Sequence, residues 1–359
     1  MNKSFFGFSK YGIGTLLLAF LLAAILGVGI GYIAQPSPSQ KVIKKAVESS
    51  PPSLQENFEF VSPQAVLLNT KAINKLEIVG LDSLVLTKIS VALQTKKARA
   101  VSVYFQDLSN GKSWTINPNE KYTPASLMKV SVLLAILKTS ESRPEMLHQE
   151  LFFAQKQQAN YTSEGSQGME LESQLIPERK YQVQHLIEEM IINSDNEATF
   201  LLLDFLEKTN KNELLEVERL FDILPPDNNI KAEDFITVSA YSRLFRTLYN
   251  ASFLSVENSD YALELLSKAI FKSGIIQSIP PEVTVAHKYG LMAVRNQGFQ
   301  LHHYGIVFHP VKPYLLGVMS KGDGGKDLRE LLGSISGIVY NHVDEFSKKT
   351  EDLLYFDII

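Results

Sequence analysis

Strands are predicted near both ends of the folded part of the chain by short runs rich in β-branched and aromatic residues. The N-terminal pair comprises Val101–Phe105 and a short strand near Trp114–Ile116, joined by a turn at Ser109–Lys112. Three later runs have the same character: Val283–Tyr289, Leu301–Phe308 and Tyr314–Ser320.

Helical periodicity fills the region between these strands. A helix from Ser126 to Lys138 is apolar on nearly all sides, so we expect it to lie in the middle of the domain. The next carries its apolar residues on one face between Val183 and Ile191 and ends at a break over Asn193–Asn196. Further helices are expected at Leu81–Leu93, Glu197–Lys208, Ser239–Asn250, Ser259–Lys272 and Lys326–His342.

This order of elements predicts the fold class. Strands, then many helices, then strands and a final helix indicate an α/β fold of the α+β type. We expect one antiparallel sheet built from both ends of the chain, flanked by helices, with an all-helical insertion between its two halves.

The N-terminal region contains a long apolar segment. Tyr11–Ala34 carries no charge, and as a helix it is long enough to cross a bilayer core of about 30 Å. A cleaved signal peptide is the alternative, but its apolar region usually covers only about 7–15 residues. We therefore expect an uncleaved transmembrane anchor. Lysines lie on both sides of it, so charge does not orient it.

Composition shifts divide the chain into five parts. An N-terminal tail (1–10) precedes the anchor (11–34), and a linker rich in proline and serine follows (35–57). A lead-in segment (58–97) then precedes the main folded domain (98–359).

The overall composition excludes several classes of function. The chain has 359 residues, 45% of them apolar, which is ample for a packed core. Its 35 basic and 39 acidic residues give a net charge of −4, which argues against a nucleic-acid-binding domain. With no cysteine, the chain has no disulfide, no thiolate nucleophile and no Cys-ligated zinc.

A serine and a lysine three residues apart open the apolar helix. Ser126 lies near free backbone N–H groups at the helix start, and Lys129 returns to the same face. A buried lysine beside a hydroxyl can act as a base, because desolvation lowers its pKa. The pair is a weak signal alone, since a serine here can simply cap the helix. The same spacing recurs at Ser109 and Lys112, in a hairpin turn.

Two further short motifs have equally plain structural explanations when taken singly. Ser194-Asp195-Asn196 lies between two helices, where all three residue types are good N-caps. Lys288-Tyr289-Gly290 ends a strand, where a lysine is usually a solvated edge charge. The glycine, however, permits close approach of another backbone or of a ligand.

In this order the three motifs resemble the signature of class A β-lactamases and penicillin-binding transpeptidases, which are serine hydrolases. The flanking sequences Pro124–Lys129 and Ile192–Ala198 are similar to the family as well, and the resemblance covers Val101–Lys348. It implies a β-lactamase-like fold and the following roles: Ser126 as nucleophile, Lys129 as base, Ser194 as proton relay, Asn196, Lys288, Tyr289 and Gly290 in substrate binding, and the backbone N–H groups of Ser126 and Leu291 as oxyanion hole.

The resemblance also implies the substrates and the location. The expected partner is a β-lactam or a D-alanyl peptide of peptidoglycan, with no metal or cofactor. The alternatives are a D,D-peptidase and an inactive surface domain that binds cell-wall peptides. Because such substrates lie outside the cytoplasmic membrane, we expect a cytoplasmic tail, one membrane span through residues 11–34 and an extracytoplasmic domain.

Two departures from the family pattern affect these expectations. Tyr289 occupies the position where the family has Thr or Ser to bind the substrate carboxylate. The stretch Leu224–Asp234 is short and lacks the Glu-x-x-x-Asn pattern that supplies the deacylating glutamate of class A β-lactamases. We expect Glu233 and Asp234 to favour the dipole of the following helix instead, and an acyl-enzyme to hydrolyse slowly.

The histidines are expected to be structural. His302 and His303 are adjacent on a predicted strand, so they point to opposite faces and do not share a metal. His287 precedes the strand lysine and is more simply explained as a structural residue than as part of the site.

Overall fold

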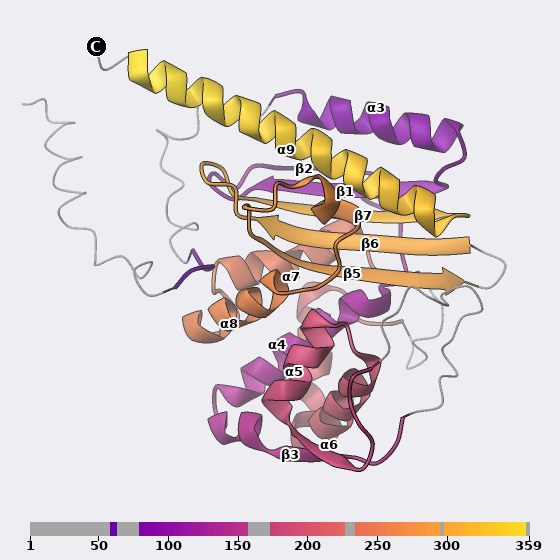
Figure 1. The fold of residues 1–359 in the computed structure, drawn as a ribbon, viewed down its shortest axis with the longest axis vertical. Helices are drawn as coiled ribbons and strands as arrows, with labels where there is room; N and C mark the ends of the chain where they lie inside the picture. Colours follow the sequence, from indigo (N-terminus) through magenta and orange to yellow (C-terminus); the bar gives the residue numbers. More distant parts are fainter. Residues whose placement is uncertain (1–57, 63–78, 157–172, 227–233, 295–297, 357–359) are drawn as a thin grey trace, which may run out of the picture. The chain divides into compact units, whose positions relative to one another are not determined.

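The chain divides into two units, Met1–Glu56 and Asn57–Ile359, of which the second contains every residue that the structure describes. A computed structural model describes residues 58–62, 79–156, 173–226, 234–294 and 298–356 (Figure 1). The predicted anchor and linker lie outside them. Within those ranges no helix combines the length and the apolar character needed to cross a membrane.

One antiparallel sheet joins the two ends of this unit. Its five strands, in the order β2-β1-β7-β6-β5, are β2 (Ser113–Ile116), β1 (Ala100–Asp107), β7 (Tyr314–Gly322), β6 (Gly298–Val307) and β5 (Val285–Val294). The pairing of β1 with β7 brings an N-terminal strand against a C-terminal one, as predicted. Strand β5 forms one edge of the sheet.

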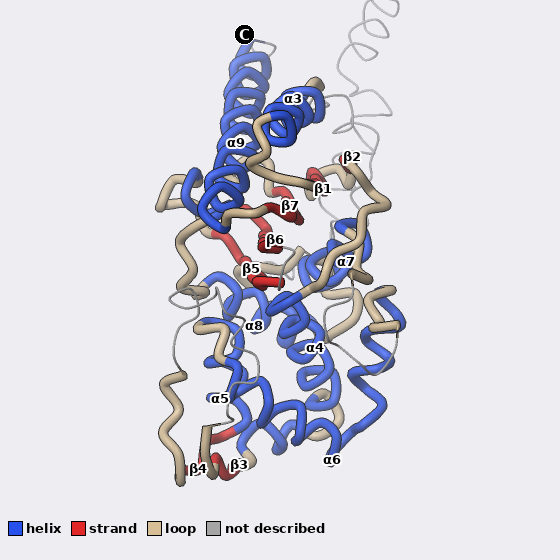
Figure 2. Tube along the Cα trace, turned by 90° about the vertical axis from the view of Figure 1, so that its right-hand side faces the viewer, coloured by secondary structure: helices blue, strands red, loops and turns tan. Residues whose placement is uncertain are grey.

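Two helices cover one face of the sheet. Helix α3 (Leu81–Gln94) and the long helix α9 (Gly325–Phe356) lie side by side above the strands (Figures 1 and 2). Their buried side chains share one apolar cluster with the sheet residues that point toward them. Helix α7 (Val238–Tyr249) lies against the opposite face, where Tyr304 of β6 donates a hydrogen bond to the carbonyl of Val238.

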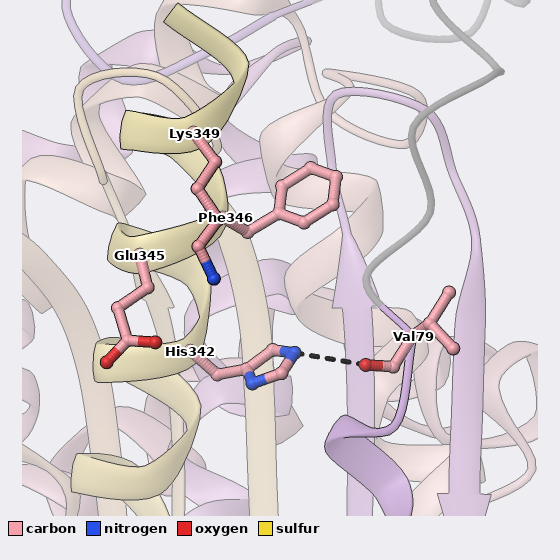
Figure 3. Close-up of a pocket in the computed structure, with 5 residues that line it drawn as sticks. All are labelled: Val79, His342, Glu345, Phe346 and Lys349. Atoms are coloured by element: carbon pink, nitrogen blue, oxygen red, sulfur yellow. Dashed lines mark hydrogen bonds between the residues drawn. The ribbon is translucent and has the colours of Figure 1, made fainter. Parts of the chain in front are cut away.

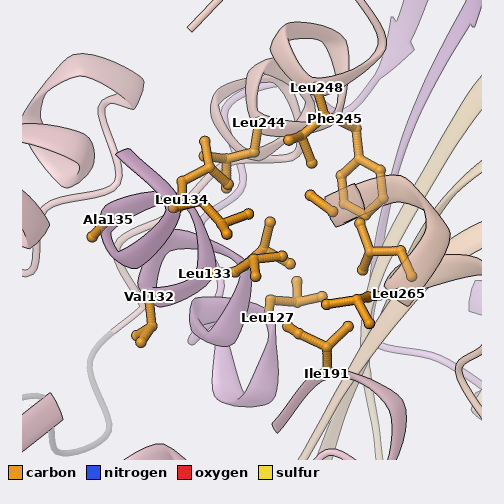
Figure 4. Packing of buried hydrophobic residues seen from close by; sticks show 14 of the residues in the cluster. Leu127, Val132, Leu133, Leu134, Ala135, Ile191, Leu244, Phe245, Leu248 and Leu265 are labelled. Atoms are coloured by element: carbon orange, nitrogen blue, oxygen red, sulfur yellow. The ribbon is translucent and has the colours of Figure 1, made fainter. Parts of the chain in front are cut away.

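The helical half is organised around α4 (Lys129–Ser140). All of its residues except Lys138 are buried, which confirms the prediction of a central helix. Figure 4 shows side chains of α4 and of the preceding 3₁₀ turn η4 (Ala125–Met128) packed among Ile191, Leu244, Phe245, Leu248 and Leu265 of neighbouring helices. These residues belong to α5 (Val183–Ile192), α7 and α8 (Val256–Ser267). Helix α6 (Asn196–Phe221) also packs against α4.

Some elements differ from the sequence predictions. A two-stranded sheet of β3 (Glu150–Phe153) and β4 (Arg179–Gln182) was not expected. Helix α6 continues past Lys208 through a kink at Asn210, and α9 continues to Phe356. Helix α8 begins earlier than predicted because Ser255 caps it, accepting a bond from Asn258 N–H, and ends at Ser267.

Candidate active site

Ser126 lies in η4, at the junction between the sheet and the helical half. The turn that contains Ser126 is a 3₁₀ helix, and no side chain caps the start of η4 or of α4. Ser126 is therefore not explained as a helix cap. The preceding residue, Ala125, has a left-handed φ of 50°, which costs about 1–2 kcal/mol and is typical of strained functional turns. By contrast, Ser109 bonds to Asp107 in the β1–β2 turn, as the hairpin explanation predicts.

The Ser194 motif serves two purposes at once. Asp195 caps α6 by accepting a 2.9 Å bond from Ala198 N–H, so capping explains the aspartate. Ser194 has a left-handed φ of 57°. Its side chain and that of Asn196 are turned instead toward Lys129 of the central helix.

The three motifs meet at the hydroxyl of Ser194. Lys129 Nζ donates to Asn196 Oδ1 at 2.7 Å, to Ser194 Oγ at 3.2 Å and to the Ser194 carbonyl. Lys288 Nζ donates to the same Ser194 Oγ at 2.7 Å. Side chains 65 and 94 residues apart in the sequence from Ser194 thus share one oxygen atom.

The two lysines disfavour each other's charge. Lys288 is 1% exposed, and burial, followed by the charge on Lys129, holds its pKa well below the usual value for a lysine. Because both ammonium groups reach one hydroxyl, the positive charge of each makes loss of a proton from the other more favourable. The arrangement therefore suits proton transfer between Ser194 and the lysines.

Gly290 brings strand β5 against the segment that contains Ser126. A Cβ atom at this position would lie 2.6 Å from the Pro124 carbonyl oxygen and 3.2 Å from the Leu127 amide nitrogen. No side chain fits there without displacing backbone. The close approach expected of this glycine is thus made by the turn containing Ser126.

The hydrogen-bond pattern of β5 points the Leu291 N–H away from β6. Phe308 N–H donates to the Thr284 carbonyl, so these two residues form a hydrogen-bonded pair. The register is continuous from Val285 to Val294, and in an antiparallel ladder such pairs alternate. Leu291 therefore falls at a non-hydrogen-bonded position, with its N–H at the open edge of the sheet, one residue beyond Gly290.

Tyr289 is held in an aromatic stack. Its ring lies 3.8 Å from that of Phe271 at an interplanar angle of 14°, and Lys288 Nζ lies 4.8 Å from the tyrosine ring centroid. The side chain is 9% exposed. The ring therefore lies beside the buried lysine, and its contact with substrate stays a prediction.

Asp234 holds the segment just before Ser126 in place, which the sequence did not reveal. Its Oδ1 accepts bonds from Thr123 Oγ1 at 2.9 Å and from Gln300 Nε2 at 2.8 Å, and its Oδ2 pairs with Lys321 at 2.8 Å. Burial opposes ionisation, but these bonds hold its pKa below the usual value. The expected role at the helix dipole is corrected: Asp234 links the segment before Ser126 to β6 and β7. Glu233 lies outside the described residues.

The histidines occupy opposite faces, as predicted. His302 accepts a bond from Ser320 N–H at Nδ1, so its Nε2 donates to the Thr123 carbonyl at 2.9 Å. On the other face, His303 Nε2 lies 2.9 Å from His287 Nδ1. Burial lowers the pKa of His287 to about 3, so its imidazole is neutral near pH 7.

Comparison with known proteins identifies the family. A family model described as the beta-lactamase enzyme family matches residues 85–343, which is well over half of the chain. The chain belongs to the beta-lactamase enzyme family. This is a family of β-lactamase-like serine hydrolases, which agrees with the residues that meet at Ser194.

Solved structures show the same fold. PBP-A is similar with a TM-score of 0.57 at 20% identity, over 74% of this chain and 97% of PBP-A. A class A beta-lactamase from Mycobacterium abscessus gives 0.59 at 18% identity, over 72% of this chain and 99% of that enzyme. TLA-1 extended-spectrum beta-lactamase gives 0.61 at 17% identity, with 74% and 99% covered. A comparison with curated proteins gives no match.

Proposed function

We propose that the chain forms an acyl-enzyme at Ser126 with β-lactams or with D-alanyl peptides of peptidoglycan, and that it releases the acyl group slowly. The observation that carries the proposal is the convergence of Lys129 and Lys288 on Ser194 Oγ. A PBP-A mutant of the same fold has been solved as an acyl-enzyme with penicillin G, which supports this chemistry for the family.

In the acylation step, Ser126 Oγ attacks the carbonyl carbon of the amide. Lys129, one turn further along and buried, accepts the hydroxyl proton. The backbone N–H groups of Ser126 and Leu291 stabilise the oxyanion. The C–N bond then breaks, and Ser194 donates its proton to the leaving nitrogen while a lysine returns one to Ser194. An ester at Ser126 and a free amine result.

The contacts of Asp234 support the proposed slow release. Both oxygens of its carboxylate are bound by Thr123, Gln300 and Lys321. A carboxylate with both oxygens engaged is a poor base for water. This use of Asp234 favours the behaviour of a penicillin-binding D,D-peptidase over that of an efficient β-lactamase.

A chromogenic cephalosporin separates the alternatives. With the full chain in detergent, we expect a burst of colour equal to one equivalent of enzyme, followed by slow turnover. Sustained multiple turnover would instead make the chain an efficient β-lactamase. If neither this substrate nor other β-lactams gave a burst, the remaining alternative would be an inactive domain that binds cell-wall peptides. The Ser126→Ala variant is the control that should give no burst.

We also propose that Tyr11–Ala34 anchors the chain in the cytoplasmic membrane by a single span, with the catalytic domain outside. The support is the uncharged length of the segment and the location of the proposed substrates. Added protease should digest the domain in intact spheroplasts. Protection of the domain would refute this placement.

A further inference from the structure

Ala125 lies midway between two backbone carbonyl groups, each of which is bound by a buried side chain. Two residues before it, the Thr123 carbonyl accepts a 2.9 Å bond from His302 Nε2. Two residues after it, the Leu127 carbonyl accepts a 2.7 Å bond from the Tyr241 hydroxyl. Both donor side chains are fully buried, so water does not compete for these carbonyls. The turn is therefore bound at both ends.

The Tyr241 side chain is itself fixed in position. It lies in the first turn of α7, where Thr237 caps the helix by accepting a 3.2 Å bond from Ala240 N–H. Its ring packs edge-on against that of Tyr304 at 4.6 Å and lies 6.1 Å from that of Phe245. The hydroxyl is thus directed at the turn by a rigid environment.

Ala125 needs such support because its backbone is strained. Its φ of 50° is left-handed, a conformation that is unfavourable for residues other than glycine. Such a conformation persists only where the surrounding structure enforces it. The next N–H along the chain is that of Ser126, one half of the proposed oxyanion hole. Relaxation of Ala125 to a negative φ would turn this N–H out of its present direction.

We propose that Tyr241 and His302 are positioning residues for acylation. By binding the carbonyls on either side of Ala125, they keep this residue left-handed and keep the Ser126 N–H directed at the oxyanion. Each acts through the backbone of the turn, and neither is assigned a contact with substrate. The inference rests on the proposed acylation at Ser126.

Tyr241→Phe tests the proposal, with Tyr304→Phe as its matched control. The Tyr304 hydroxyl is equally buried and donates a 2.8 Å bond to the Val238 carbonyl, outside the Ser126 turn. Each variant therefore loses one buried hydroxyl and leaves one carbonyl unpaired, so we expect similar losses of stability in denaturant unfolding.

Stopped-flow acylation of the full chain by a chromogenic cephalosporin should separate the two variants. In Tyr241→Phe the limiting acylation rate should fall at least about tenfold, because an oxyanion donor is misdirected. The dissociation constant of the first complex should change by less than about twofold, since the donor acts in the transition state. Tyr304→Phe should keep both values.

Ala125→Gly supplies a readout that a loss of packing would not change. Glycine adopts the left-handed conformation without steric cost, so it needs less support from the two bonds. Added to Tyr241→Phe, Ala125→Gly should raise the limiting acylation rate at least about threefold.

His302→Leu tests the other end of the turn. Its control is His342→Leu on α9, outside the candidate active site. His342 Nε2 donates a 3.1 Å bond to the Val79 carbonyl beside a hollow of about 300 Å³ (Figure 3). We expect the limiting acylation rate to fall at least about tenfold in His302→Leu and to stay within about twofold of wild type in His342→Leu.

Equal limiting rates in Tyr241→Phe and Tyr304→Phe would overturn the proposal, as would a failure of Ala125→Gly to restore any rate. The wild-type chain distinguishes this inference from the proposed function. A wild-type chain that is not acylated refutes both. A wild-type chain that is acylated, with Tyr241→Phe no slower than its control, refutes only the positioning roles.

Discussion

Lys288 donates a 2.7 Å hydrogen bond to Ser194 Oγ from a strand 94 residues away in the sequence. The ammonium group is buried beside a second ammonium, that of Lys129, which bonds to the same oxygen. Such an arrangement is unfavourable for folding, because burial and the neighbouring charge of Lys129 both disfavour the charged form of Lys288. We infer that the arrangement serves the proposed proton transfer at Ser194.

The first prediction concerns the pH dependence that follows from this burial. The folded-state pKa of Lys288 lies below the unfolded value of 10.5, so its charge destabilises the folded state below pH 10.5. This unfavourable contribution of the Lys288 charge to stability is present in full below the folded-state pKa, and it disappears as the pH rises to 10.5. Lys288→Met should therefore raise the free energy of unfolding by about 1–4 kcal/mol at neutral pH, and by less toward pH 10.

Acylation should fall at least about 10²-fold in the same variant, because a positioned charge is lost from the site. Denaturant unfolding at several pH values and acylation kinetics measure both effects. The control is Lys321→Met: although burial opposes its charge, bonds to Asp234 and Glu120 raise the pKa of Lys321, so its loss should destabilise the protein. A Lys288→Met variant that is less stable than the wild type at neutral pH would contradict the electrostatic argument.

The second prediction concerns the close approach at Gly290. Gly290→Ala places a Cβ atom 2.6 Å from the Pro124 carbonyl, and the resulting shift should cost about 1–3 kcal/mol of stability and displace the Ser126 turn. We expect a much larger loss of acylation rate than of folded protein. In the control, Gly324→Ala, the added Cβ meets only the Asp327 carboxylate at 3.0 Å. Equal acylation rates in the two variants would refute the role of this contact.

The third prediction concerns Asp234. Asp234→Asn removes its ion pair with Lys321 and should cost about 1–2 kcal/mol, a modest value because a third of the side chain is exposed. The folded pKa lies below the unfolded 3.8, so this stabilisation is present above pH 3.8 and is lost as the pH falls through the folded pKa. Thermal melting of both proteins should show a difference that is constant at neutral pH and narrows below pH 4.

The same variant tests whether Asp234 only holds the segment before Ser126 in place or also activates water. Hydrolysis of a preformed acyl-enzyme should proceed at the wild-type rate within about twofold, because the carboxylate does not activate water. A drop in release of about 10² or more, in the range typical of a lost general base, would show that Asp234 is that base after all.

The fourth prediction concerns Tyr289. Tyr289→Phe keeps the ring and its stack on Phe271 while removing the phenol hydroxyl. If the hydroxyl binds the substrate carboxylate, the preference for a penicillin over its methyl ester should fall roughly tenfold or more. Phe271→Leu is the control, because it loosens the stack and keeps the hydroxyl. An unchanged preference in Tyr289→Phe would show that the hydroxyl does not bind the substrate carboxylate and that Tyr289 contributes only packing.

Much of the fold was predictable because periodicity marks buried elements. The wholly apolar helix after Ser126 and the β-branched strands are signals of burial, and the structure confirms both. The short strands Glu150–Phe153 and Arg179–Gln182 carry no such signal, since most of their side chains are exposed. The continuation of α6 beyond Asn210 was missed because the backbone at Asn210 is not helical and the helix has a kink there.

Only the site residues that belong to short sequence motifs were predictable. Ser126, Ser194 and Lys288 belong to motifs whose spacing along the chain is recognisable. The bracing of Thr123 by Asp234 depends on a contact 111 residues apart, between residue types that are common on any surface. Only the folded chain brings such pairs together.

Peptide mapping by mass spectrometry after treatment of the full chain with benzylpenicillin tests acylation most directly. The predicted result is one penicilloyl adduct on the peptide that contains Ser126. The adduct should disappear in Ser126→Ala and persist in Ser109→Ala, which alters the other Ser-x-x-Lys sequence of the chain. Absence of an adduct, or an adduct that survives Ser126→Ala, would contradict acylation at Ser126.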